Sequence, residues 1–158
     1  IQPAITDILR RNVVRNGLRE VVTVVPMGCF SSDGEAVIEP HGDPGAARIA
    51  FGPGELRVPL MTLDRYAETA ALDRLDLILV DAEGADFEIL KGASAVLSKF
   101  RPIVLAEVHH LEAFGGSEEG LRRFMAQFGY VARELQGVYS RDLLFTAATP
   151  KETAVAGD

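Results

Sequence analysis

The sequence has few of the features that mark a secreted, membrane-bound or disulfide-stabilised protein. Cys29 is the only cysteine, which excludes an internal disulfide and a cysteine-rich zinc site. No apolar run approaches the roughly 18 residues that a membrane-spanning helix requires. The start, IQPAITDILRR, lacks both the apolar core and the small-residue cleavage site of a signal peptide. These absences predict a cytoplasmic protein that does not enter a membrane.

Positive charge is scarce as well. The chain has 16 Lys and Arg against 23 Asp and Glu, a formal net charge of −7, which repels a phosphate backbone and argues against nucleic-acid binding. A small or neutral substrate fits better. The composition, 47% hydrophobic and 25% charged in 158 residues, is typical of a globular domain with one sizeable core. We expect one α/β domain over residues 1–150 and a polar tail over 151–158.

The first part of the chain alternates between helical and extended patterns. Apolar residues recur at helical spacing over residues 5–16, and the β-branched run 21–27 predicts a strand. Gly and Pro then crowd together over residues 31–59. This composition predicts a mobile loop with small strands at 36–38 and 48–51.

The second part carries a strand–helix–strand pattern. Thr62 is placed to cap a short helix, and residues 75–80 and 103–106 read as strands. Residues 77–80 and 103–106 lack polar alternation, which predicts burial on both faces, as in parallel sheets. The segment between them has helical spacing with a break at Gly92, so the three elements form a βαβ unit.

The last part predicts one helix and two strands. Ser117 is placed to cap a helix, and residues 130–135 and 143–147 have strand character with a short turn between them. These two strands are expected to pair antiparallel and to close the sheet.

Acidic side chains follow two of the predicted strands directly. Asp81 and Glu83 come after the strand that ends at Val80, and Glu107 and His109 come after the next one. Because the carboxyl ends of neighbouring parallel strands meet at one edge of a sheet, we expect these four side chains to share one rim, where α/β sheets bind ligands.

The same four residues also have a purely structural interpretation. Asp81 and Glu83 would then cap the following helix, whose N-terminus favours negative charge. Glu107 would accept hydrogen bonds from backbone amides, and His109 would be a partly exposed imidazole.

Four motifs occur in order between Val58 and His109. They are Thr62-Leu63-Asp64, Asp81-Ala82-Glu83-Gly84-Ala85-Asp86, Leu90-Lys91-Gly92-Ala93, and Glu107 at the end of the second strand. In this order they resemble the core of the FkbM family of S-adenosylmethionine-dependent methyltransferases. The resemblance extends from Pro3 to about Leu111. Asp86 departs from the family's usual glutamate, although a shorter acid can still serve a first helical turn.

The resemblance implies only part of that family's fold. The family's glycine-containing loop after its first strand, and the acid that holds the ribose hydroxyls, are absent from these residues, and the chain opens on Ile1 rather than methionine. We therefore expect a fragment of a class I, Rossmann-like methyltransferase that lacks about two N-terminal strands. Its doubly wound sheet would be mostly parallel, with the antiparallel pair at the C-terminal end.

The resemblance also implies an activity. A full protein of this kind transfers a methyl group from S-adenosylmethionine, most often to a hydroxyl of a sugar or a small natural product. Met27, Gly28, Cys29 and Asp81 would bind the cofactor. Asp81 or His109 would act as base, with Glu83 and Glu107 orienting the acceptor hydroxyl or stabilising the sulfonium. The loop over residues 31–59 would fold over the acceptor.

Two alternatives remain open at this stage. A divalent metal held by Asp81, Glu83, Glu107 and His109 would make the protein a hydrolase. A truncated, non-catalytic α/β module would instead bind a partner, or a second copy of itself, through the sheet edge that the missing strands leave bare.

Overall fold

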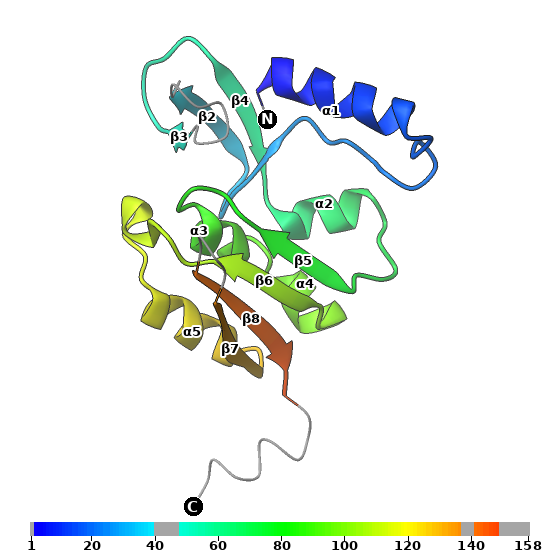
Figure 1. The fold of residues 1–158 in the computed structure, drawn as a ribbon. Helices are drawn as coiled ribbons and strands as arrows, with labels where there is room; N and C mark the ends of the chain where they lie inside the picture. The colour runs from blue at the N-terminus through cyan, green and yellow to red at the C-terminus, as the bar shows by residue number, and fades with distance from the viewer. Residues whose placement is uncertain (1, 40–47, 137–140, 149–158) are drawn as a thin grey trace, which may run out of the picture.

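The computed structural model describes residues 2–39, 48–136 and 141–148 (Figure 1). Its helices are α1 (Pro3–Arg15), α2 (Leu63–Thr69), α3 (Asp86–Lys91), α4 (Ser94–Phe100) and α5 (Glu118–Ala126), with a 3-10 turn, η2 (Leu111–Phe114). Its strands are β1 (Gly28–Cys29), β2 (Gly34–Glu39), β3 (Arg48–Ala50), β4 (Arg57–Met61), β5 (Leu77–Val80), β6 (Ile103–Glu107), β7 (Tyr130–Gln136) and β8 (Arg141–Ala147). The predicted tail over 151–158, and the centres of the predicted loop and of the last turn, lie outside the described residues. Within the described ranges, none of the helices combines the length and the hydropathy of a membrane span.

The strands form two mixed sheets. The first has the order β1-β4-β2-β3 and the second the order β5-β6-β8-β7. The α/β class is therefore confirmed, whereas the expected mostly parallel sheet is matched only in part, because only the pairs β1–β4 and β5–β6 are parallel. The predicted antiparallel pair is present as β7–β8, and β8 also runs antiparallel to β6. Figure 1 shows the first sheet above the second.

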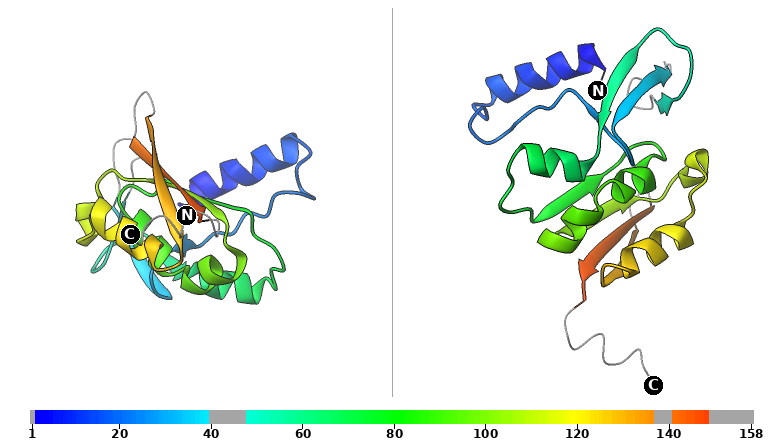
Figure 2. Two further views of the ribbon diagram at one scale, coloured as in Figure 1. Left: turned by 90° about the horizontal axis from the view of Figure 1, so that it is seen from below. Right: turned by 180° about the vertical axis from the view of Figure 1, so that it is seen from behind.

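The second sheet carries the main core on one of its faces. Its inward side chains are packed against helices α3, α4 and α5, of which Figure 2 (right) shows α4 and α5 in front of the strands. The cluster includes Leu90, Leu97, Val104, Leu121 and Phe145, each completely buried. Burying each such side chain stabilises the fold by about 1.5–3 kcal/mol relative to leaving it in water.

The opposite face of this sheet is not covered by any of the described residues. Leu77, Leu79 and Ile103 are 55%, 66% and 46% exposed, although strand alternation buries their neighbours Ile78 and Val104. The prediction that both buried runs are covered on two faces is therefore wrong for the described chain. Both strands are uniformly hydrophobic in sequence, but no described helix or strand packs against their second face.

The strand predicted over residues 21–27 is also wrong. Only Gly28–Cys29 is assigned as strand, in parallel with Leu60–Met61 of β4. Val21 is 76% exposed, and the amides of Val21 and Val22 turn back to the carbonyl of Leu18. A β-branched run becomes a strand only where another strand pairs with it, and no described strand does so here.

Several local predictions are confirmed. The predicted first helix is α1, followed by Gly17 with φ +68°. Thr62 caps α2 by accepting from the Arg65 amide at 3.0 Å, and Ser117 caps α5 by accepting from the Gly120 amide at 3.1 Å. The helical segment after β5 breaks at Gly92 into α3 and α4.

Asp64 lies in the first turn of α2 and caps another helix. Its carboxylate accepts hydrogen bonds from the amides of Ala95 and Val96, at 2.9 and 2.8 Å, and so caps α4 rather than its own helix. The residue that precedes α4, Ala93, makes no side-chain cap, so this distant carboxylate supplies it. The Thr62-Leu63-Asp64 motif thus joins α2 to α4.

Candidate active site

A tight turn follows β5 and brings its acids against the loop after β6. Glu83 and Gly84 adopt left-handed backbone conformations, with φ of +51° and +98°. A Cβ at Gly84 would lie 2.4 Å from the carbonyl oxygen of His110, a distance at which no side chain fits. Glycine is therefore required both for the conformation and for the close approach of the two loops.

Asp81 and Glu107 lie side by side, as the motif at both strand ends predicted. The strands β5 and β6 are parallel with Val80 opposite Ala106, so the next residue of each strand meets at the same edge, about 4.8 Å apart. His109 approaches Glu107, with Nδ1 3.4 Å from Oε1. Thus Asp81, Glu107 and His109 are brought together at one rim.

A third acid extends this row across the sheet. Asp142 on β8 is the register partner of Glu107, so the two side chains project from the same face. By strand alternation this is the bare face that also carries Leu79 and Leu105. Glu107 and Asp142 thus place two like charges directly opposite one another, in line with Asp81.

Asp86 lies beneath the turn and is completely buried. Its Oδ2 accepts from the amide of Gly84 at 3.2 Å, and its Oδ1 has no hydrogen-bond partner among the described residues. Burial, together with the charge of Asp81, raises the pKa of Asp86 above its ordinary value, against the lowering effect of nearby backbone amides. A buried carboxyl with one unsatisfied oxygen is costly, so its presence calls for a role.

Glu107 is subject to the same two effects. Burial raises its pKa first, the nearby charge of Asp81 adds to this rise, and the charge of His109 opposes it. A carboxyl group beside another negative charge ionises less readily, because the two charges repel each other. Glu107 is in this position next to Asp81.

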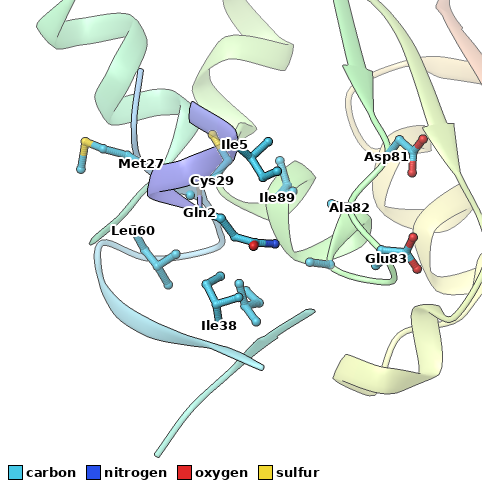
Figure 3. Close-up of a pocket in the computed structure, with 13 residues that line it drawn as sticks. Gln2, Ile5, Met27, Cys29, Ile38, Leu60, Asp81, Ala82, Glu83 and Ile89 are labelled. Atoms are coloured by element: carbon cyan, nitrogen blue, oxygen red, sulfur yellow. The ribbon is translucent and has the colours of Figure 1, made fainter. Parts of the chain in front are cut away.

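A pocket of about 430 Å³ adjoins the rim (Figure 3). It brings Met27, Gly28 and Cys29 together with Asp81 and Glu83, so all four predicted cofactor-binding residues line one cavity. Glu107 and His109 do not line this pocket. Glu107 interacts with Asp81, which does line it, and His109 contacts Glu107.

Figure 3 also shows how the pocket is divided. Asp81 and Glu83 lie at one side, with their carboxyl groups pointing away from the aliphatic side chains. Ile38 and Leu60 lie toward the other side, where β2 and β4 contribute to the wall, and Ile89 of α3 lies between the two sides. The two acidic side chains therefore lie at the border of the pocket, and the aliphatic side chains line its interior. Burial of Cys29 in this wall raises the pKa of its thiol.

Close packing of the β1 segment on the α3–α4 junction brings these two sides together. A Cβ at Gly92 would lie 2.2 Å from the carbonyl oxygen of Phe30, so only glycine allows the segment after β1 to approach. The hydroxyl of Ser31 donates to Glu88 Oε2 at 2.6 Å, and Lys91 pairs with the same glutamate. The Leu90-Lys91-Gly92-Ala93 motif thus holds one wall of the pocket.

The metal-dependent alternative is not favoured by this geometry. Within the described ranges, no group of three or more His, Cys, Asp or Glu side chains is arranged to hold a metal ion. The acids are close enough to repel one another, but their oxygens do not converge on a common point.

Two residues of the site cannot be placed from the sequence. Asp142 is an acid directly before a hydrophobic run, but the sequence does not specify its register partner Glu107. Asp86 is visible in the sequence only as a variant of a family glutamate, and its complete burial follows from tertiary packing.

Comparison with known proteins relates the fold and the sequence of this chain to one family. A solved structure, the methyltransferase FkbM from Methylobacillus flagellatus KT, is similar with a TM-score of 0.59 at 16% identity, which supports a shared fold. The match covers 89% of this chain and 32% of that chain, so the present chain spans about a third of the length of that protein. No curated protein sequence matches significantly. The family model of the methyltransferase FkbM domain matches residues 5–132, more than half of the chain, and the chain therefore belongs to this family.

Proposed function

We propose that the protein carrying this chain transfers a methyl group from S-adenosylmethionine to a hydroxyl of a sugar or a small natural product. Membership of the FkbM methyltransferase family supports the reaction class. The observation that carries the proposal is the convergence of Asp81 and Glu107 from parallel strands beside the pocket of Met27, Gly28 and Cys29.

The pocket and rim fit this cofactor in size and charge. A volume of about 430 Å³ lies in the range of small-molecule sites, and the lining combines aliphatic walls with an acidic edge. S-adenosylmethionine, when bound, supplies a methyl group on a positively charged sulfur. The carboxylates of Asp81 and Glu83 at the edge of this pocket are a suitable environment for such a cation. Met27, Gly28 and Cys29 would hold its adenine side.

The rim residues have to orient the acceptor and remove its proton. Asp81 is placed best for this, because it is the acid that both lines the pocket and contacts Glu107. His109, at 3.4 Å from Glu107, is the alternative base. Glu83 and Glu107 would orient the hydroxyl or stabilise the positive charge, and residues 31–59 would contribute to acceptor choice.

Replacing Asp81 in the full-length protein tests the proposal. Asp81→Asn keeps the shape of the side chain and removes its basicity, so we expect methyl transfer to fall about 100-fold or more, as for loss of a general base, with little change in the melting temperature. Asp73→Asn, the same change on an exposed loop at the other end of β5, is the control and should leave turnover unchanged. Unchanged turnover in Asp81→Asn would remove this residue from the mechanism. Absence of both S-adenosylmethionine binding and methyl transfer in the unmodified protein would overturn the function itself.

A further inference from the structure

Three carboxyl groups from two loops lie close together at the rim. Asp81 and Glu107 end neighbouring strands in register, and Asp86 lies buried below the turn that joins Asp81 to α3. The charges of Asp81 and Asp86 both act on Glu107, and that of Asp81 acts on Asp86. The negative charge of Asp81 therefore disfavours the ionisation of both Asp86 and Glu107.

The surroundings of this set add more negative than positive charge. From the β5 side Glu83 shares the turn, from β8 Asp142 lies opposite Glu107, and after β6 His109 approaches Glu107 at 3.4 Å. Asp86 Oδ2 accepts from the Gly84 amide, but Oδ1 has no hydrogen-bond partner among the described residues, so the charge of this carboxyl is compensated only in part. A proton held within the set, or a cation bound beside it, would relieve the repulsion.

We propose that Asp81, Asp86 and Glu107 form a proton-sharing unit, which releases a proton when a cationic ligand binds at the rim and takes up the proton of the acceptor hydroxyl during methyl transfer. This inference rests on the proposed function and goes beyond it, since it assigns a role to Asp86 and links the charge of the cofactor to the protonation of the site. Asp86 does not reach the pocket lining and is a positioning residue, because it acts through Asp81 and Glu107.

The balance of the reaction explains why such a unit is useful. The O–H bond of the acceptor breaks and an O–C bond forms, while the C–S bond breaks and leaves its electron pair on sulfur. The sulfonium thereby loses its positive charge, and the hydroxyl proton passes to the carboxylate unit. The site exchanges one positive charge for another, so the total charge near the buried Asp86 stays the same through the reaction.

Proton release on binding is the quantity that tests this unit. We would titrate the full-length protein with S-adenosylmethionine and, separately, with S-adenosylhomocysteine, which lacks the sulfonium charge. Isothermal calorimetry in two buffers of different ionisation enthalpy, between about pH 5 and 8, gives the number of protons released by each ligand. We expect the sulfonium ligand to release more, by up to about one proton per site, because its positive charge favours the ionised form of the neighbouring carboxyl groups.

Substitutions test whether the proton release comes from these three carboxyl groups or from acidic residues in general. Asp86→Asn should reduce the difference between the two ligands although Asp86 lies outside the pocket lining, whereas Asp73→Asn should leave it unchanged. If Asp86→Asn does not fold, Glu107→Gln decides instead and should also reduce the difference. Equal proton release by the two ligands in the unmodified protein, or an unchanged difference in a folded Asp86→Asn or Glu107→Gln variant, would overturn the unit while the methyltransferase function stands. Failure of both ligands to bind would overturn the function and the unit together.

Discussion

Asp86 shows how one buried residue can set a property of a whole site. Its carboxyl accepts the Gly84 amide and so holds the turn that presents Asp81 and Glu83. The same position removes it from water and places it near another negative charge, which raises its pKa from the ordinary 3.8. One side chain therefore contributes both to the shape of the turn and to the electrostatics of the rim.

The raised pKa of Asp86 predicts a pH dependence of stability. A carboxyl whose folded-state pKa is raised binds its proton more tightly in the folded than in the unfolded protein. Its contribution to the unfolding free energy therefore falls as pH rises from the ordinary 3.8 to the raised value, and is constant above that. We expect Asp86→Asn to gain stability relative to the unmodified protein through this window, by about 1.4 kcal/mol for each pH unit that the window spans.

Urea unfolding at a series of pH values measures this effect. Asp73→Asn, on the exposed loop before β5, serves as the matched control and should give a difference in unfolding free energy that varies little with pH. A difference for Asp86→Asn that is equally constant would mean that the buried carboxyl ionises as it does in the unfolded chain.

At the scale of elements, short helices are held by contacts from distant parts of the chain. The helix α4 has seven residues and lacks a cap from its own preceding residue, and Asp64 supplies two hydrogen bonds to its first amides. Isolated helices of this length are unstable in water, so α4 depends on such contacts.

Removing this cap should therefore lower the stability of the chain. We expect Asp64→Ala to reduce the unfolding free energy by about 1–3 kcal/mol, because it leaves the amides of Ala95 and Val96 without their acceptor. Asp64→Asn, which keeps one oxygen acceptor, should cost less. Denaturant unfolding monitored by circular dichroism gives both values, and an Asp64→Ala variant as stable as the unmodified chain would show that water replaces the cap.

For the whole molecule, the uncovered face of the second sheet is the dominant feature. The strand β5 forms one edge of this sheet, and Leu77, Leu79 and Ile103 beside it are exposed. An edge without charged residues or proline invites pairing with another strand. This surface gives the proposal of self-association its physical basis, for the chain studied as a separate piece.

We expect the 158-residue chain to associate in a concentration-dependent way through this edge. Leu79→Lys should weaken the association by placing a charge on the face beside the edge, and should change the unfolding free energy by less than about 0.5 kcal/mol because Leu79 is 66% exposed. Val14→Lys, at a 45% exposed position of α1, is the control. Sedimentation velocity measures the association. If both substitutions weaken the association equally, the association is due to nonspecific hydrophobic contacts and not to the β5 edge.

Patterns between close neighbours in the sequence determined much of the local structure. The helix α1, the caps at Thr62 and Ser117 and the break at Gly92 depend on residues within a few positions, so the sequence by itself was sufficient for them. The adjacency of Asp81 and Glu107 also followed, because a strand–helix–strand unit brings its carboxyl ends to one edge. The motifs around these residues were enough to indicate the family.

Tertiary structure alone decided the features that depend on residues far apart in the chain. Residues 21–27 have the composition of a strand, but no described strand pairs with them. The apolar strands β5 and β6 are covered by described residues on one face only. The register that places Asp142 beside Glu107, the cap that Asp64 gives to α4 and the desolvation of Asp86 all arise from packing. Pairing, burial and charge coupling are set by neighbours in space, and local sequence patterns do not specify those neighbours.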